Sequence, residues 1–315
     1  MTNQIPNLAF LFPGQGSQSL GMGKQLAEEF PRARDIFQDG DQILGINLSN
    51  IAWNGPQEAL DDTINTQPAL LVHSFAMLEI VRDLFPGLKP VAVAGHSMGE
   101  LSALIAAGAL QFQDGLLLVR RRGELMKEAG EIAPGGMAAI LGLDIDTLEE
   151  ICSSASSGEE IVQIANDNCP GQVVISGSDS ALEKAMNLSR ESGAKRVVRL
   201  AVSIAAHSPL MEFAQDKFSQ AVGATEINTP QVPIIGNVTA SPLVSTEDVQ
   251  ADLRAQLNSR VRWTESIHHL LSMGVTTFIE IGNNTVLAGL LKRIDRSARV
   301  ISIGAPQDLE KVSSL

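Results

Sequence analysis

The chain has 315 residues, 44% of them hydrophobic, which is enough for a large core in one or two domains. Its formal net charge of −13 argues against nucleic acids and anionic membranes as partners, because both would repel it. The chain contains no apolar run of membrane-spanning length, and its first residues lack the pattern of a signal peptide. Two cysteines, Cys152 and Cys169, without Cys-x-x-Cys spacing indicate neither a disulfide framework nor a zinc site. We therefore expect a cytoplasmic enzyme.

The N-terminal part of the chain alternates strand and helix patterns. The apolar run Leu8 to Phe12 ends at Pro13-Gly14, which predicts a strand closed by a tight loop, and residues 91–94 predict a second strand. Helical spacing of apolar residues predicts helices over residues 22–37, 69–84 (with Pro68 in the first turn), 101–110 and 115–128. This alternation implies a parallel sheet covered by helices on both faces.

The pattern changes at Ala133-Pro134-Gly135-Gly136. The expected elements are then a strand at 137–143, a helix at 146–155, strands at 161–166 and 172–176, a helix at 180–191 and a strand at 194–200. Their order, β-α-β-β-α-β, is that of a ferredoxin-like unit. We therefore expect residues 133–200 to form a small inserted subdomain, and residues 1–132 and 201–315 to form the large α/β subdomain.

The C-terminal part returns to alternating elements. Helices are predicted at 209–222, 246–258, 265–273 and 286–294, and strands at 232–236, 276–281 and 299–302. The last residues, 307–315, are expected to form a mobile tail.

Ser97 is the strongest candidate for chemistry. It lies in Gly95-His96-Ser97-Met98-Gly99, directly after a predicted strand and directly before a predicted helix. This is the context of the nucleophile elbow of α/β-hydrolase-like folds, where small residues allow a sharp turn and the helix N-terminus favours negative charge. The alternative is a plain glycine-rich turn between strand and helix.

A nucleophilic serine needs a base, and histidine suits neutral pH best. The chain has five histidines: His73, His96, His207, His268 and His269. Three of them lie inside predicted helices, and His96 is adjacent to Ser97, so its side chain should point elsewhere. His207 follows the strand-like segment 202–204 and precedes the helix start Ser208-Pro209. We therefore expect His207 to be the base, although a lone histidine is more often structural.

The loop after the first strand reads Phe12-Pro13-Gly14-Gln15-Gly16-Ser17-Gln18. It has no lysine, so it is not a phosphate loop of the Walker type. Gln15 and a backbone amide at this sheet edge can supply one donor of an oxyanion hole, the other being the amide of Met98 after the nucleophile. The alternative is a simple turn.

Three consecutive arginines, 120 to 122, interrupt an otherwise apolar helical pattern. On a helix they fan over about 200°, so at least one points away from the others. A solvated helix face is the simple explanation, whereas a buried guanidinium would suit an acidic substrate because its planar fork binds a carboxylate at two points.

With these motifs the chain resembles the malonyl-coenzyme A:acyl carrier protein transacylases, a family that includes the acyltransferase domains of fatty acid and polyketide synthases. The resemblance covers essentially the full length. It is carried by the loop 12–18, the nucleophile motif 95–100, Arg122-Gly123, residues 172–177 and His207-Ser208-Pro209-Leu210-Met211.

The resemblance implies that Ser97 becomes acylated, that His207 is its base and that Arg122 anchors the free carboxylate of malonyl. Gln15 and the Met98 amide would form the oxyanion hole. The reaction would be ping-pong transfer from malonyl-coenzyme A to the phosphopantetheine thiol of an acyl carrier protein, without metal or other cofactor. A backbone carbonyl within 259–263, rather than an aspartate, would orient the histidine.

Two positions depart from the family pattern, namely Gly282-Asn283-Asn284-Thr285 and Ala206, whereas Met98 agrees with a malonyl substrate. A thioester hydrolase with the same Ser97–His207 pair, a trans-acting acyltransferase of a polyketide pathway and a non-catalytic docking module are the alternatives. Arg122 favours transfer of an acidic acyl group. We expect a monomer whose acidic carrier protein docks on a basic patch drawn from Lys195, Arg196, Arg199, Lys292, Arg293 and Arg296.

Overall fold

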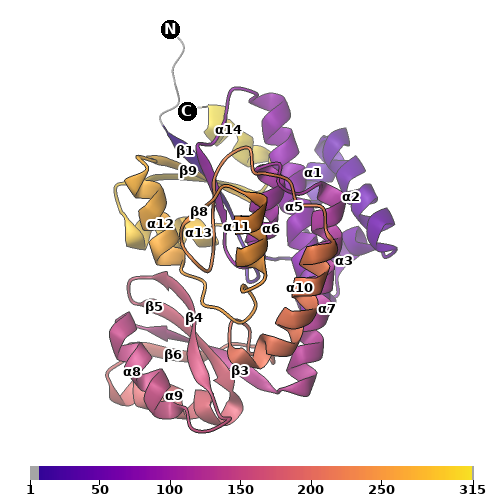
Figure 1. Ribbon diagram of the computed structural model, residues 1–315. Helices are drawn as coiled ribbons and strands as arrows, with labels where there is room; N and C mark the ends of the chain where they lie inside the picture. Colours follow the sequence, from indigo (N-terminus) through magenta and orange to yellow (C-terminus); the bar gives the residue numbers. More distant parts are fainter. Residues whose placement is uncertain (1–6, 314–315) are drawn as a thin grey trace.

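A computed structural model describes residues 7–313, and two separate sheets organise them (Figure 1). The larger sheet has six strands in the order β10-β9-β1-β2-β7-β8, and the smaller has four in the order β4-β5-β3-β6. The large sheet occupies the upper part of Figure 1 and the small one the lower part. Among the described helices, none is both long and apolar enough to cross a bilayer.

The large sheet is parallel except at one edge. Its strands are β1 (Leu8–Phe12), β2 (Ala92–Gly95), β7 (Ile234–Ile235), β8 (Pro242–Leu243), β9 (Thr277–Ile281) and β10 (Arg299–Ile303), and only β8 runs antiparallel to its neighbour. Every residue of β1, β2 and β9 is buried, as expected for central strands covered on both faces. Because parallel strands end at one edge, the loops after β1 and β2 emerge side by side.

The predicted helix over residues 22–37 is wrong in one respect, because the chain forms two helices there. These are α1 (Lys24–Glu29) and α2 (Pro31–Leu44), separated at Phe30, whose backbone is extended with φ −117°. Pro31 has no N–H and disfavours helical geometry in the residue before it, so it ends one helix and begins the next. Two short helices, α3 (Leu48–Asn54) and α4 (Gln57–Asp61), follow without having been predicted.

The prediction that Pro68 lies in the first turn of a helix is also wrong. Helix α5 runs from Thr63 to Leu84, capped by the Asp62 side chain, and Pro68 lies inside it. A proline inside a helix leaves the carbonyl four residues earlier without its usual donor. Here that carbonyl belongs to Ile64, and Arg120 donates to it at 3.1 Å, which explains how the helix continues past the proline.

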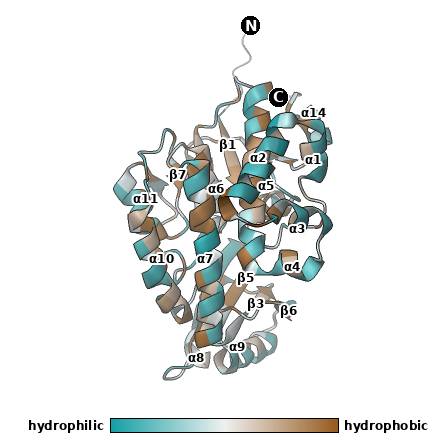
Figure 2. Ribbon diagram, turned by 90° about the vertical axis from the view of Figure 1, so that its right-hand side faces the viewer, coloured by the Kyte–Doolittle hydropathy of each residue, from teal (hydrophilic) through white to brown (hydrophobic). Residues whose placement is uncertain are grey.

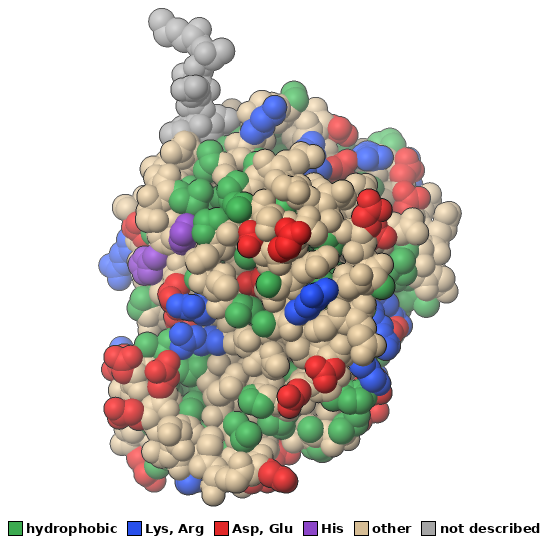
Figure 3. All heavy atoms as spheres, in the orientation of Figure 1, with side chains coloured by type: hydrophobic (Ala, Val, Ile, Leu, Met, Phe, Trp, Pro, Cys, Tyr) green, Lys and Arg blue, Asp and Glu red, His purple; other side chains and the backbone are tan. Residues whose placement is uncertain are grey.

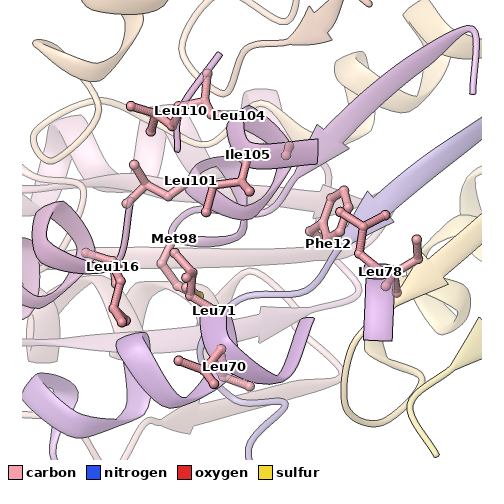
Figure 4. Packing of buried hydrophobic residues seen from close by; sticks show 14 of the residues in the cluster. Phe12, Leu70, Leu71, Leu78, Met98, Leu101, Leu104, Ile105, Leu110 and Leu116 are labelled. Atoms are coloured by element: carbon pink, nitrogen blue, oxygen red, sulfur yellow. The ribbon is translucent and has the colours of Figure 1, made fainter. Parts of the chain in front are cut away.

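Short helix α6 (Gly99–Ala106) is packed between α5 and α7 (Phe112–Ile132), and its first seven residues are buried. Figure 4 shows Met98 and Leu101 among Leu70 and Leu71 of α5 and Leu116 of α7. In Figure 2 the outer helices α7 and α10 (Glu212–Ala224) carry many hydrophilic residues. The helix after Ser97 is therefore a core helix, which holds the elbow rigidly.

The small sheet confirms the ferredoxin-like order. Its elements are β3 (Gly135–Leu141), α8 (Ile145–Ala155), β4 (Val162–Cys169), β5 (Gln172–Ser178), α9 (Asp179–Glu191) and β6 (Arg196–Arg199). Each pair of neighbouring strands is antiparallel. Ile140 and Ile175 face α8 and α9 in a core of their own, whereas Met137 and Val174 belong to the large core. Alternation along the strands thus gives the small sheet one face for its helices and one for the rest of the protein. The division into subdomains at residues 133 and 200 stays a prediction.

The remaining elements complete the large sheet's covering layers. They are the 3₁₀ turn Pro209–Met211, α11 (Thr246–Leu253), α12 (Trp263–Ser272), α13 (Val286–Ile294), a second 3₁₀ turn (Pro306–Asp308) and α14 (Leu309–Ser313). Helix α11 is shorter than predicted. The expectation of a mobile tail from residue 307 is wrong for the residues up to 313, because Leu309 and Val312 are buried in the core. The last two residues of that expected tail lie outside the described residues.

Candidate active site

Ser97 lies on a sharp turn between β2 and α6, with φ +53°, a left-handed conformation that costs free energy for a residue other than glycine. The two neighbouring glycines make this turn possible. A Cβ on Gly95 would lie 2.0 Å from the backbone of Gly99, and a Cβ on Gly99 would lie 2.2 Å from the carbonyl oxygen of Phe12. The chain therefore forms the strand–turn–helix geometry of a nucleophile elbow.

A buried asparagine that no sequence motif singles out holds this turn. The Ser97 N–H donates to Asn237 Oδ1 at 2.7 Å, and Asn237 Nδ2 donates to the carbonyl of Gly95 at 2.7 Å. The Ser97 amide is consequently occupied and not free to bind an oxyanion. The next amide along, that of Met98 at the start of α6, remains the candidate donor.

His207 reaches Ser97 from a distant part of the chain. Ser97 Oγ lies 2.9 Å from His207 Nε2, and His207 Nδ1 lies 2.9 Å from the carbonyl oxygen of Gln256 and 3.0 Å from that of Ser259. Because carbonyl oxygens only accept, Nδ1 carries the hydrogen and Nε2 is left to accept the serine proton. Two backbone carbonyls orient the imidazole, one of them inside the expected range 259–263 and one outside it.

The surroundings keep this imidazole neutral. Burial, together with the nearby positive charge of Arg122, lowers the pKa of His207 to about 3. A neutral imidazole is the form that can take a proton.

The strand expected at 202–204 is wrong, because this segment is a loop, and His207 itself has φ +59°.

Arg122 is 1% exposed and reaches the nucleophile directly. Its Nη2 donates to Ser97 Oγ at 3.0 Å, its Nη1 to Gln67 Oε1 at 2.8 Å and its Nε to Gln256 Oε1 at 3.0 Å. Burial lowers the pKa of Arg122 to about 10, so the group is still charged at neutral pH. A buried cation whose hydrogen bonds go to neutral groups is suited to an anionic ligand beside Ser97.

The other two arginines of the run behave differently, as their spacing on a helix predicted. Arg120 pairs with Glu124 at 2.9 Å, and Arg121 pairs with the same carboxylate at 3.5 Å from an exposed position. Of the three, only Arg122 is buried and reaches Ser97.

Gln15 lies in the loop after β1 and is connected to Arg122 through two side chains. Thr63 Oγ1 donates to Gln15 Oε1 at 3.0 Å, Gln67 Nε2 donates to Thr63 Oγ1 at 2.8 Å, and Gln67 in turn accepts from Arg122. The structure thus brings Ser97, His207, Arg122 and the Gln15 loop together. It also adds Gln67, Asn237 and Gln256, whose amide side chains sequence reasoning missed.

Gln15, Ser97, Arg122 and His207 line a cavity of about 460 Å³ between the two sheets. Its apolar lining residues include Met126, Val174, Val202, Ala206 and Leu290. The size and the mixture of an apolar wall with a few polar groups are typical of a small-molecule site. No group of three or more His, Cys, Asp or Glu side chains able to hold a metal ion occurs in residues 7–313.

The remaining histidines make other contacts. His96 Nε2 lies 2.7 Å from Asn168 Oδ1, and His73 is buried in α5 with its Nε2 2.9 Å from the carbonyl oxygen of Gly304. His268 and His269 lie in α12, where His268 is exposed.

The loop 282–285, one of the two departures from the family pattern, is tied to the Gln15 loop. Asn283 Nδ2 donates to the carbonyl of Ser17 at 2.6 Å and to Ser19 Oγ at 2.9 Å, and Asn284 Nδ2 donates to the same Ser17 carbonyl at 2.7 Å. The two asparagines thus fix the shape of the neighbouring loop.

Comparison with known proteins agrees with this geometry. The acyl transferase domain family matches residues 9–305. The chain is 46% identical over 306 residues to the malonyl CoA-acyl carrier protein transacylase of Bacillus subtilis, covering 97% of this chain and 96% of that protein. The solved transacylase of Coxiella burnetii is 40% identical with a TM-score of 0.94 and coverage of 98% and 97%.

A further solved structure holds a type II polyketide acyl carrier protein in complex with its malonyl-transacylase. It is 39% identical, with a TM-score of 0.93 and coverage of 97% of this chain and 98% of that one. The chain therefore belongs to the acyl transferase domain family and, within it, to the malonyl CoA-acyl carrier protein transacylases.

Proposed function

We propose that the protein transfers a malonyl group from malonyl-coenzyme A to the phosphopantetheine thiol of an acyl carrier protein. The observation that carries the proposal is the position of Ser97 Oγ, 2.9 Å from a neutral imidazole and 3.0 Å from a buried guanidinium. The first contact suits a nucleophile, and the second suits a substrate whose acyl group ends in a carboxylate.

The chemistry follows from the hydrogen bonds. His207 Nε2 takes the Ser97 proton as Oγ attacks the thioester carbonyl, and the two carbonyls at Nδ1 stabilise the imidazolium that forms. The Met98 amide and the Gln15 loop bind the tetrahedral oxyanion. His207 returns the proton to the leaving coenzyme A thiolate, and malonyl-Ser97 remains. The carrier thiol then loses its proton to His207 and attacks this ester, the malonyl thioester of the carrier protein forms, and His207 returns the proton to Ser97 Oγ as the ester bond breaks. No step requires another cofactor.

Intact mass spectrometry after mixing with malonyl-, methylmalonyl- and acetyl-coenzyme A tests this function. We expect a malonyl adduct on Ser97 that is absent from Ser97→Ala, and acylation by malonyl slowed about 10- to 100-fold in Arg122→Ala. Arg121→Ala is the matched control, since Arg121 is exposed on the same helix. If Arg122→Ala accepted malonyl as fast as the unaltered protein, the anchoring role would be wrong. Rapid release of free malonate without carrier protein would favour the hydrolase alternative.

The docking surface that we propose for the carrier protein joins basic residues of the small sheet, among them Arg196, to basic residues of α13, among them Arg293. In the small sheet Arg196 pairs with Leu141 and Leu141 pairs with Gln172, so these residues form a row across three strands. Gln172 lines the cavity and accepts a hydrogen bond from Arg293 of α13. Figure 3 shows Lys and Arg side chains gathered at the level where the two parts of the molecule meet.

Not every residue of the expected patch supports this surface. Arg199 forms an ion pair with Asp179 instead. We expect the double substitution Lys195→Glu, Arg196→Glu to raise KM for the carrier protein about tenfold and to leave acylation by malonyl-coenzyme A unchanged. An equal loss in both half-reactions would contradict the docking surface.

A further inference from the structure

Two buried carboxyl groups lie behind the contact between Ser97 and Arg122. Glu100, in the first turn of α6, is fully buried, and Asp252, near the end of α11, is 3% exposed. Two consecutive backbone amides serve them: the Asn237 N–H donates to Glu100 Oε1 at 3.0 Å, and the Val238 N–H donates to Asp252 Oδ1 at 3.2 Å. The two carboxyl groups therefore lie next to each other.

Each side chain also shifts the pKa of the other, as expected for two carboxyl groups this close together. Asp252 Oδ2 is buried and receives no N–H or hydroxyl donor from the described part of the chain. Two ionised carboxylates buried side by side would repel each other, whereas a proton on one of them supplies the donor that Asp252 Oδ2 lacks. We propose that Glu100 and Asp252 share one proton, so that Glu100 is a neutral carboxylic acid that donates to the Asp252 carboxylate.

The surroundings place the proton on Glu100 rather than on Asp252. Asp252 accepts from the backbone amides around Val238, which stabilises its charge. The N-terminus of α6 favours a charge on Glu100, but complete burial next to the Asp252 carboxylate outweighs it and raises the pKa of Glu100 well above its usual range.

Gln256 connects this pair to the site. Its Nε2 donates to Glu100 Oε2 and, at 3.3 Å, to the carbonyl of Ser97, which turns Oε1 toward Arg122 Nε. A neutral Glu100 leaves the Arg122 charge available to an anionic substrate. Glu100 and Asp252 are thus positioning residues for the recognition of an acidic acyl group, an inference that rests on the proposed function.

The first test is spectroscopic and independent of activity. Infrared difference spectra between the unaltered protein and Glu100→Gln at neutral pH should show the carbonyl band of one protonated carboxylic acid, which the variant lacks. Glu124→Gln, which removes an exposed and ion-paired carboxylate, is the control and should leave that band in place. Absence of a protonated-acid band would overturn the shared proton, whether or not malonyl-Ser97 forms.

The second test separates charge from shape. Glutamine can donate to Asp252 and its one oxygen can accept from Gln256, at the cost of the bond from the Asn237 N–H, so Glu100→Gln should keep KM for malonyl-coenzyme A within about threefold. Asp252→Asn should let Glu100 ionise beside Arg122 and raise that KM about tenfold, with a smaller effect on kcat.

Adding Glu100→Gln to Asp252→Asn should restore the low KM, because no ionised carboxylate then faces Arg122. Equal KM values in the single Asp252→Asn variant and the double variant would overturn the proposal. A protein that forms no malonyl adduct but keeps the acid band would instead refute only the proposed function.

Discussion

The nucleophile and its base are held in place in different ways. The turn at Ser97 is formed by its immediate neighbours, because the glycines at 95 and 99 allow it and the buried helix α6 continues it, and Asn237 then holds it through two hydrogen bonds. His207 lies in a loop and is positioned by distant groups, namely the carbonyls of Gln256 and Ser259 at its ring and the Gln163 side chain at its own carbonyl.

Ser97 and His207 are therefore sensitive to different kinds of substitution. A local turn depends on steric fit, so a single added methyl group can destroy it. A loop held by long-range hydrogen bonds depends on donors from the small sheet and on the charge state of the imidazole. Substitutions can therefore affect one half and leave the other intact.

The largest effect should come from Gly95→Ala, which breaks the local half. The new Cβ would lie 2.0 Å from the Gly99 backbone, which cannot move without displacing α6. We expect a loss of about 3 kcal/mol or more in the free energy of unfolding and a fall of at least about 100-fold in the rate of malonyl-Ser97 formation. Urea unfolding measures the free energy of unfolding, and intact mass spectrometry measures the rate of malonyl-Ser97 formation.

Gly289→Ala is the matched control, because a Cβ there has no atom within 4 Å and the residue lies on an exposed face of α13. It should stabilise the protein by up to about 1 kcal/mol. An active, stable Gly95→Ala protein would show that the elbow does not depend on that glycine.

The same contrast explains how much of the site could be predicted from sequence. The elbow was predictable because its geometry requires particular small residues around Ser97. His207 was identified only as the one histidine outside a helix and not adjacent to the nucleophile. The groups that orient it are backbone carbonyls, which every residue has, so no residue type marks them.

Buried amide side chains were unpredictable for a related reason. Gln67, Asn237 and Gln256 lie far apart in the sequence, and amides are common on surfaces. Only the fold shows that all three surround Ser97 and Arg122. In the fold, the ferredoxin-like unit followed from periodicity. The place of Pro68 inside its helix depended on the contact between Arg120 and Ile64, 56 residues apart, which no local pattern contains.

A smaller effect should appear in the pH dependence of the free energy of unfolding, and it depends on His207 and not on Ser97. The pKa of His207 is about 3 in the folded protein against an ordinary value of 6.5, so below pH 6.5 the unfolded chain binds a proton that the folded one does not. Titration of His207 therefore leaves the free energy of unfolding unchanged above pH 6.5. Below pH 6.5 it lowers that free energy by roughly 1.4 kcal/mol per pH unit, until the pKa of His207 in the folded protein is approached.

The measurement compares the unaltered protein with His207→Gln by urea unfolding at several pH values. The difference between the two free energies of unfolding should shrink by about 2–3 kcal/mol between pH 6.5 and about pH 4.5. Other titrating groups cancel in this difference. A difference that stays constant with pH would mean that His207 titrates normally in the folded protein.

The smallest effect should come from Gln163, through which the small sheet reaches the base. Its Nε2 donates to the carbonyls of His207 and Asn258 at 2.8 and 3.2 Å. Gln163→Leu should cost about 1–2 kcal/mol of stability and lower kcat about tenfold, with little change in KM, since Arg122 is untouched. Gln163→Glu has the same shape but no donor, and it should lose at least as much. If the glutamate variant kept full activity, the base would be positioned by the carbonyls of Gln256 and Ser259 alone, and the contrast between a locally fixed nucleophile and a remotely fixed base would be weaker than we infer.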